Sequence, residues 1–154
     1  MPFNSPALES KLLDMIKNPP PSPFEAGKKL GQAYAEFVKP ALGAGSPGTF
    51  TGLEAFSLAA AAGASFQAPG LPPQSINGIV NGITAFWLAP PVTFGPAVTS
   101  LWTGQGVLIS CLAAMANLRI TEGLAAKKLV QCFDAATRLV FVQPPGPVPP
   151  VPLA

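Results

Sequence analysis

The sequence predicts a mainly α-helical protein of about five or six short helices, with extended proline-rich arms at both ends. Three helix-start signals support this prediction, at Ser22, Thr51 and Thr121. Hydrophobic residues make up 49% of the 154 residues, whereas disordered chains are poor in them. The 20 prolines gather between the helical stretches and near the ends. We therefore expect a folded middle with extended ends.

The first half of the chain contains two expected helices with clear limits. Ser5 and Pro6 open the first, and the prolines at 19–21 end it. Ser22 and Glu25 form a capping box around Pro23, which predicts the start of the second helix. Apolar residues then follow one face as far as Val38, before the glycine-rich loop 43–48.

Four further helices are expected along the rest of the chain. Thr51 and Glu54 form a second capping box, before an alanine-rich helix that reaches about Ala62. Breaks at proline and glycine then separate a helix over 76–88, which Ser75 caps, from one over about 97–118. The sixth begins at Thr121. Its end, residues 139–142, is rich enough in β-branched residues to form a short extended strand.

These patterns divide the chain into three parts. Residues 1–22 form an N-terminal helix and proline-rich linker, 23–142 a helical domain, and 143–154 a proline-rich C-terminal arm. Proline lacks a backbone N–H, so this arm is expected to be polyproline-like and to dock on a neighbouring subunit. Its apolar contact points are Val148, Val151 and Leu153.

Charge is scarce and unevenly placed. Only 10% of the residues are charged, where about 25% is usual, and residues 55–118 contain no Asp, Glu, Lys or Arg. The net charge of +2 and the lack of a clustered basic face argue against a nucleic-acid partner. A solvated helix normally carries charge, so the uncharged stretch must be covered by its own chain, by neighbouring proteins or by lipid.

Lipid is the competing explanation for this uncharged stretch. Val98 to Leu118 is long enough to span a bilayer of about 30 Å. The segment also contains six polar side chains, and no cluster of Lys or Arg flanks it to fix an orientation. We therefore favour a protein–protein packing surface. The alternative is a small integral membrane protein with one or two helices in the bilayer.

The chemistry of the chain argues against catalysis. It contains no histidine, which removes the usual general base and the commonest metal ligand. Gly43 to Gly48 spells G-x-G-x-x-G, but a helix precedes it, so we interpret it as a linker. Cys111 and Cys132 lie in apolar helical contexts and are interpreted as two buried thiols. The sequence thus predicts no enzyme, no cofactor and no metal.

Four aromatic residues gather in the uncharged stretch: Phe86, Trp87, Phe94 and Trp102. Two explanations remain open for them. They either pack in the core or anchor an interface, since Trp and Phe are enriched at interface centres.

The sequence also resembles a group of known proteins. The uncharged middle, the segments 81–87 and 133–140, and the proline-rich ends are similar to minor structural proteins of tailed bacteriophages. The resemblance implies a virion component of the capsid, neck or tail, with other structural subunits and copies of itself as partners. It also implies a location in the virion or a large particle. Because the N-terminus has no signal-peptide pattern, we expect synthesis in the host cytoplasm.

Overall fold

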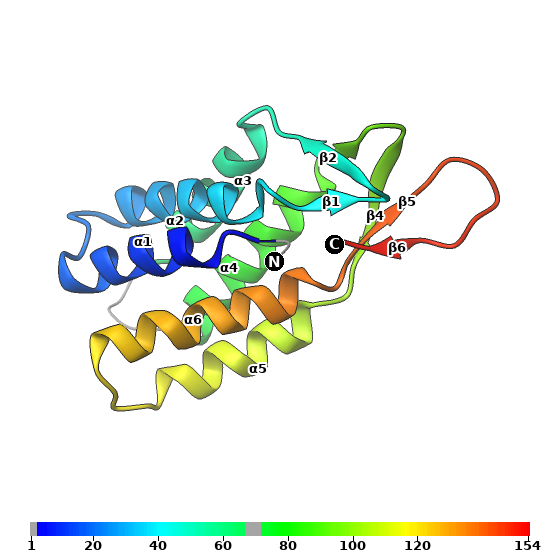
Figure 1. The fold of residues 1–154 in the computed structure, drawn as a ribbon. Helices are drawn as coiled ribbons and strands as arrows, with labels where there is room; N and C mark the ends of the chain where they lie inside the picture. Colours follow the sequence, from blue (N-terminus) through cyan, green and yellow to red (C-terminus); the bar gives the residue numbers. More distant parts are fainter. Residues whose placement is uncertain (1–2, 67–71) are drawn as a thin grey trace.

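The computed structural model describes residues 3–66 and 72–154, where it contains six helices and a small antiparallel sheet (Figure 1). The helices are α1 (Ser5–Lys17), α2 (Pro23–Val38), α3 (Leu53–Ser65), α4 (Pro73–Leu88), α5 (Gln105–Ala116) and α6 (Glu122–Thr137). The strands are β1 (Leu42–Gly43), β2 (Ser46–Thr49), β3 (Thr93–Phe94), β4 (Ala97–Trp102), β5 (Val140–Gln143) and β6 (Val151–Pro152). The expected helical character is confirmed at 59% helix, but the sheet makes the fold mixed α/β.

The order of the elements repeats three times along the chain. Each repeat has two helices followed by a β-hairpin: α1–α2–β1–β2, then α3–α4–β3–β4, then α5–α6–β5–β6. The second helix of each repeat has 16 residues, and these helices begin at residues 23, 73 and 122. Nearly equal spacing of one supersecondary unit is the mark of a repeat architecture.

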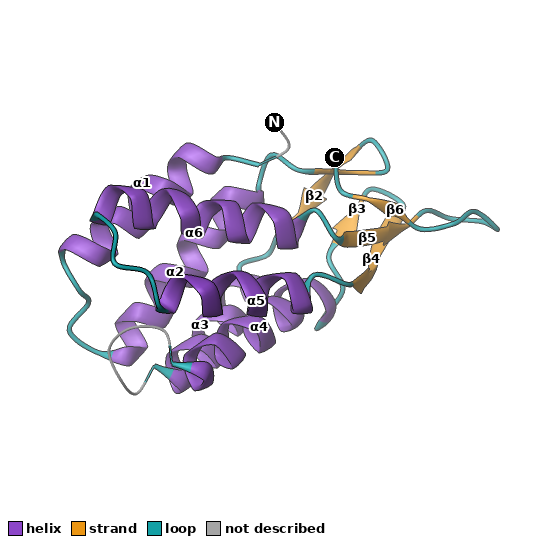
Figure 2. Ribbon diagram, turned by 90° about the horizontal axis from the view of Figure 1, so that it is seen from below, coloured by secondary structure: helices purple, strands orange, loops and turns teal. Residues whose placement is uncertain are grey.

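The six helices pack in the order of the chain, and the first meets the last. Each helix contacts the next one along the sequence, and α1 also contacts α6. The helices run side by side, and the three hairpins lie together at one end of them (Figures 1 and 2). The helices thus form a closed ring with the sheet at one end.

The sheet closes in the same way as the helices. Its strands are antiparallel and follow the order β1-β2-β3-β4-β5-β6. Leu42 in β1 and Ala154 after β6 exchange two backbone hydrogen bonds, of 2.8 and 2.9 Å. The two outer strands are therefore joined, and the described part of the sheet has no open edge for another chain to pair with.

Aromatic side chains fill the interior where the helices meet the sheet. Tyr34 lies edge-on to Phe86, with ring centroids 5.0 Å apart, and Trp87 stacks on Phe94 at 6.3 Å. All four side chains are buried. This end of the ring is therefore densely packed.

Two of the expected helix starts, at Ser22 and Thr121, are confirmed. The expected caps Thr51 and Ser75 are wrong, because Gly52 is the N-cap of α3 and Pro72 that of α4. The Ser22 hydroxyl accepts from the N–H of Glu25 at 3.2 Å, and the Thr121 hydroxyl accepts from that of Leu124 at 3.4 Å. Near Thr51, the helix begins at Leu53, and the Glu54 carboxylate accepts from the Thr51 N–H at 3.1 Å. In α1, the cap is Asn4 rather than Ser5.

The fifth helix expected over 97–118 is wrong in its first part. Residues 97–102 form β4, and the helix begins only at Gln105. A tight turn with Gly95 at φ 61° reverses the chain, and the alternating burial of β4 suits a strand packed on one face. The extended segment expected over 139–142 is confirmed as β5.

The described residues do not show the expected proline-rich arms. At the N-terminal side, Phe3 is only 3% exposed and the Asn4 N–H donates to the carbonyl of Phe37 at 2.8 Å. At the C-terminal side, residues 151–152 form β6, and Leu153 is 6% exposed. Proline lacks a donor but keeps its carbonyl, so a very short strand next to prolines still pairs.

The prediction that the two cysteines are buried free thiols is wrong. Cys111 in α5 and Cys132 in α6 form a disulfide, with Cα atoms 5.6 Å apart. Because a short connection makes α5 and α6 neighbours, residues 21 positions apart in sequence lie opposite each other. The G-x-G-x-x-G segment is the turn of the first hairpin, with Ala44 and Gly45 at positive φ.

Candidate functional site

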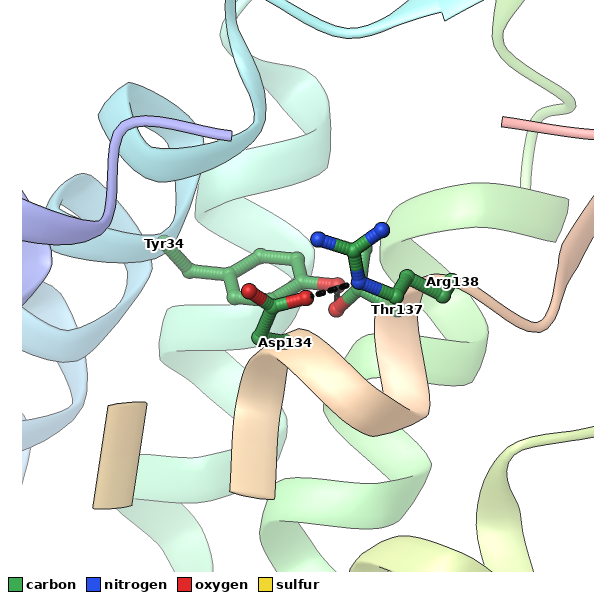
Figure 3. Close-up of polar contacts among 4 residues, drawn as sticks. All are labelled: Tyr34, Asp134, Thr137 and Arg138. Carbon is green, nitrogen blue, oxygen red and sulfur yellow. Dashed lines mark hydrogen bonds and ion pairs between the residues drawn. The ribbon is translucent and has the colours of Figure 1, made fainter. Parts of the chain in front are cut away.

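A buried polar contact joins the three repeats at the centre of the ring. The Tyr34 hydroxyl in α2 lies 2.8 Å from the Thr137 hydroxyl in α6 and accepts from the Trp87 indole N–H in α4 at 2.9 Å. Figure 3 shows Tyr34 directed at Thr137. Burial raises the pKa of Tyr34 far above its usual range. A neutral hydroxyl without access to solvent has a structural role, so we assign this contact to stability.

A second polar contact lies beside the first, at the surface. Asp134 and Arg138, one turn apart on α6 and its end, form an ion pair (Figure 3). The Arg138 guanidinium also lies 5.7 Å from the centre of the Phe3 ring. Arg138 therefore helps hold the start of the chain against the helices.

The ring of helices has a charged side and an uncharged side. Outside Glu54, all charged residues belong to α1, α2, α6 or the segments next to these helices. Glu54 itself is buried and is used in the start of α3. The exposed surfaces of α3, α4 and α5, which are consecutive in the ring, therefore carry no charge; we call them the uncharged side.

Large apolar side chains are exposed on both outer helices of the uncharged side, α3 and α5. On α3, Leu53 is 56% exposed and Phe56 is 67% exposed. On α5, Val107 and Ile109 are 41% and 39% exposed, on opposite flanks of the helix because they are two positions apart. Isolated apolar residues are normal on a surface, but neighbouring large ones on uncharged helices mark an interaction site.

A row of amides lies on α4, between α3 and α5. Gln74, Asn77 and Asn81 are exposed on α4, at the spacing of one helix face. In the ring, α4 contacts both α3 and α5. Across the ring, the uncharged side therefore has exposed apolar side chains on α3, amide side chains on α4 and exposed apolar side chains on α5.

A large apolar cavity opens away from the sheet. Its volume is about 720 Å³, and it lies among the ends of the helices that face away from the hairpins. The residues that line it are Leu12, Met15, Ile16, Pro19, Pro20, Pro21, Ser22, Pro23, Ala26, Leu30, Phe66, Ile79, Leu112, Met115, Ala116, Ala125, Leu129 and Phe133. A second cavity of about 430 Å³ between α1 and α2 is lined by polar residues, including Lys11, Asp14 and Lys29.

The residues that the sequence suggested for an interface lie mainly inside the protein. Phe86, Trp87, Phe94 and Trp102 are all buried in the core. A side chain without exposed surface does not anchor a partner, so the core explanation fits these four.

The three C-terminal candidates lie in different surroundings. Val148 is exposed in the connection between β5 and β6. Val151 is half-buried in β6, and Leu153 is buried against the chain's own core. The exposed residues of α3 and α5 were missed, because their exposure depends on how the ring closes and not on local sequence.

Within residues 3–66 and 72–154, no helix has both the length and the hydropathy needed to span a bilayer. The same residues contain no group of three or more His, Cys, Asp or Glu side chains placed to hold a metal ion. No family model, curated protein or solved structure matches this chain.

Proposed function

We propose that this chain is a structural subunit of a large protein assembly, and that copies of it pack together through the uncharged side. The sequence resemblance favours a bacteriophage virion as that assembly, with the chain in the capsid, neck or tail. The observation that carries the proposal is the exposed apolar–amide–apolar surface of α3, α4 and α5.

The first support is the cost of removing water from this surface. Burying a charge without a partner is expensive, and the centres of protein interfaces are depleted in charged residues. The exposed faces of α3, α4 and α5 have none. Phe56 and Ile109 supply apolar area, and the amides of α4 supply donors and acceptors without charge.

The second support concerns the identity of the partner. A two-fold interface needs a surface that is complementary to itself. Suppose that the two-fold axis runs along the amides of α4. The amides of the two copies then face each other, and α3 of one copy faces α5 of the other. An amide group donates and accepts, so it pairs with another amide. A second copy of this chain therefore satisfies both kinds of group.

Two further features agree with a particle subunit. The closed sheet offers no strand edge in its described part, so association through the helices is favoured over strand pairing. The Cys111–Cys132 disulfide suits a protein that spends time outside a reducing cytoplasm, as on a virion surface.

Sedimentation velocity over a range of protein concentrations tests the proposal. We expect the wild-type chain to associate as its concentration rises. A Phe56→Lys/Ile109→Lys double variant places one positive charge on α3 and one on α5, and it should remain monomeric. Gln32→Lys/Gln131→Lys adds the same two charges at exposed positions of α2 and α6 and is the matched control, which should associate like the wild type. Wild-type protein that stays monomeric at every concentration would contradict self-association through this side.

Two simpler measurements address the particle and the membrane alternative. Mass spectrometry of purified virions should detect the chain as a component. Flotation with liposomes should leave the chain in the soluble fraction. Recovery only after detergent extraction would instead favour a small integral membrane protein.

A further inference from the structure

The apolar cavity at the open end of the helix ring has no role in the proposed assembly. It lies away from the sheet, among residues of α1, α2, α4, α5 and α6 and the proline-rich link between α1 and α2. We propose that it binds an uncharged hydrocarbon chain, such as the alkyl part of a fatty alcohol or of a neutral lipid.

The chemistry of the lining defines this class of ligand. Among the described residues that form the wall, Ser22 alone has a polar side chain. Its hydroxyl oxygen accepts from the N–H of Glu25 at 3.2 Å, so this one group offers a ligand little beyond its O–H donor. A charged or strongly polar ligand would lose hydrogen bonds to water there without replacement. A hydrocarbon loses none and gains apolar burial.

The depth of the cavity points to a bound molecule rather than to a surface contact. Leu30, Ile79, Leu112 and Phe133 form part of its wall and are buried in the core. The cavity therefore reaches between the helices. Its volume of about 720 Å³ also falls within the roughly 300–1,000 Å³ of small-molecule sites.

The unequal packing of the two ends explains why the space exists. Aromatic rings from α2, α4 and β3 fill the ring at the sheet end. At the open end, three wall positions are alanines, Ala26, Ala116 and Ala125. Because the space is open to solvent, its apolar walls contact water, and covering them with a hydrocarbon is favourable.

The prolines at the edge of the cavity favour a preformed binding site. Pro19, Pro20, Pro21 and Pro23 line the mouth, and proline restricts the backbone. A rigid rim reduces the entropy lost on binding. The cavity is also larger than one apolar side chain, so a single residue from a neighbouring copy would fill it only in part.

The test uses the full chain and the uncharged fluorescent probe N-phenyl-1-naphthylamine. We expect saturable binding and displacement by 1-dodecanol. Ala125→Phe fills the cavity from α6 and Ala26→Phe fills it from α2, and each should weaken probe binding by about tenfold or more, the equivalent of about 1.4 kcal/mol. Ala113→Phe is the matched control, since Ala113 is exposed on α5 and does not line the cavity. Circular dichroism establishes that each variant is folded.

The outcomes separate this proposal from self-association. Binding that persists in the Phe56→Lys/Ile109→Lys variant supports a site independent of the uncharged side. Three results would overturn the proposal: no saturable binding, equal binding by folded cavity-filling variants and the control, or binding that declines as the protein associates. The last result would mean that a second copy occupies the cavity.

Discussion

Replacing Tyr34 with phenylalanine should destabilise the protein strongly, although it removes only one oxygen atom. The Tyr34 hydroxyl is the point where the three repeats meet, through the Thr137 hydroxyl and the Trp87 indole N–H. All three side chains are buried. Phenylalanine keeps the ring contacts with Phe86 but leaves the other two polar groups without this partner.

The expected magnitude follows from these two lost contacts. A buried donor left without an acceptor costs about 1–3 kcal/mol, and this applies to the Trp87 N–H. The lost bond to Thr137 adds about 1 kcal/mol. We therefore expect Tyr34→Phe to lower the free energy of unfolding by about 2–4 kcal/mol.

Urea unfolding followed by circular dichroism measures this change. With a slope of about 2 kcal/mol per molar urea, the midpoint should fall by about 1–2 M. Thr137→Val provides the partner variant for a double-mutant cycle. Its cost should be about 1 kcal/mol in the wild type and close to zero in the Tyr34→Phe background. If Tyr34→Phe lowers the free energy of unfolding by less than about 0.5 kcal/mol, the argument is refuted, because ordinary surface substitutions have effects of that size.

Four further predictions follow from the described contacts. Gly27→Ala should cost about 1–3 kcal/mol in thermal unfolding, because the new Cβ would lie 2.4 Å from the Ala59 carbonyl oxygen. Gly106→Ala meets nothing within 4 Å on α5 and should stabilise by up to about 1 kcal/mol. Tyr34 is the only tyrosine, so ultraviolet titration of the native protein should show no ionisation at about pH 10, where the unfolded chain titrates. Above the pKa of Tyr34 in the unfolded chain, the unfolded state loses a proton that the native state keeps, so the free energy of unfolding should fall as the pH rises. Formation of tyrosinate near pH 10 without unfolding would show that Tyr34 is not buried. Reduction of the Cys111–Cys132 disulfide should lower stability by about 3 kcal/mol, and unchanged melting in reductant would show that it does not form.

Local signals in the sequence predicted the helices well. Ser22 and Thr121 cap their helices as expected, because an N-cap depends only on residues within one turn. The β-branched end of α6 was also read correctly as an extended segment. These features need no information from distant parts of the chain.

The sheet and the arms could not be predicted in the same way. Residues 97–102 were assigned to a helix, because an uncharged apolar run fits both helix and strand when it is short. Their partner, β5, lies some forty positions later, at Val98↔Gln143 and the pairs that follow. Proline suggested a free arm over 143–154, whereas pairing with β1 and burial of Leu153 hold this segment on the chain itself.

The sequence predicts that an uncharged surface exists, but it does not predict which residues are exposed on that surface. The uncharged stretch 55–118 is visible in the sequence, and it supplies α3, α4 and α5. The sequence singled out Trp87 and Trp102, which are large and apolar. Closure of the ring buries them and leaves Phe56 and Ile109 exposed. The disulfide was missed because it depends on the packing of α5 against α6.

Hydrogen–deuterium exchange at low and high protein concentration tests most directly whether copies meet through the uncharged side. The account predicts that peptides from α3 (Leu53–Ser65) and α5 (Gln105–Ala116) become more protected as the concentration rises. Peptides from α2 (Pro23–Val38), on the charged side, should exchange at the same rate throughout. Protection that appears on α2 while α3 and α5 remain unchanged would contradict the account.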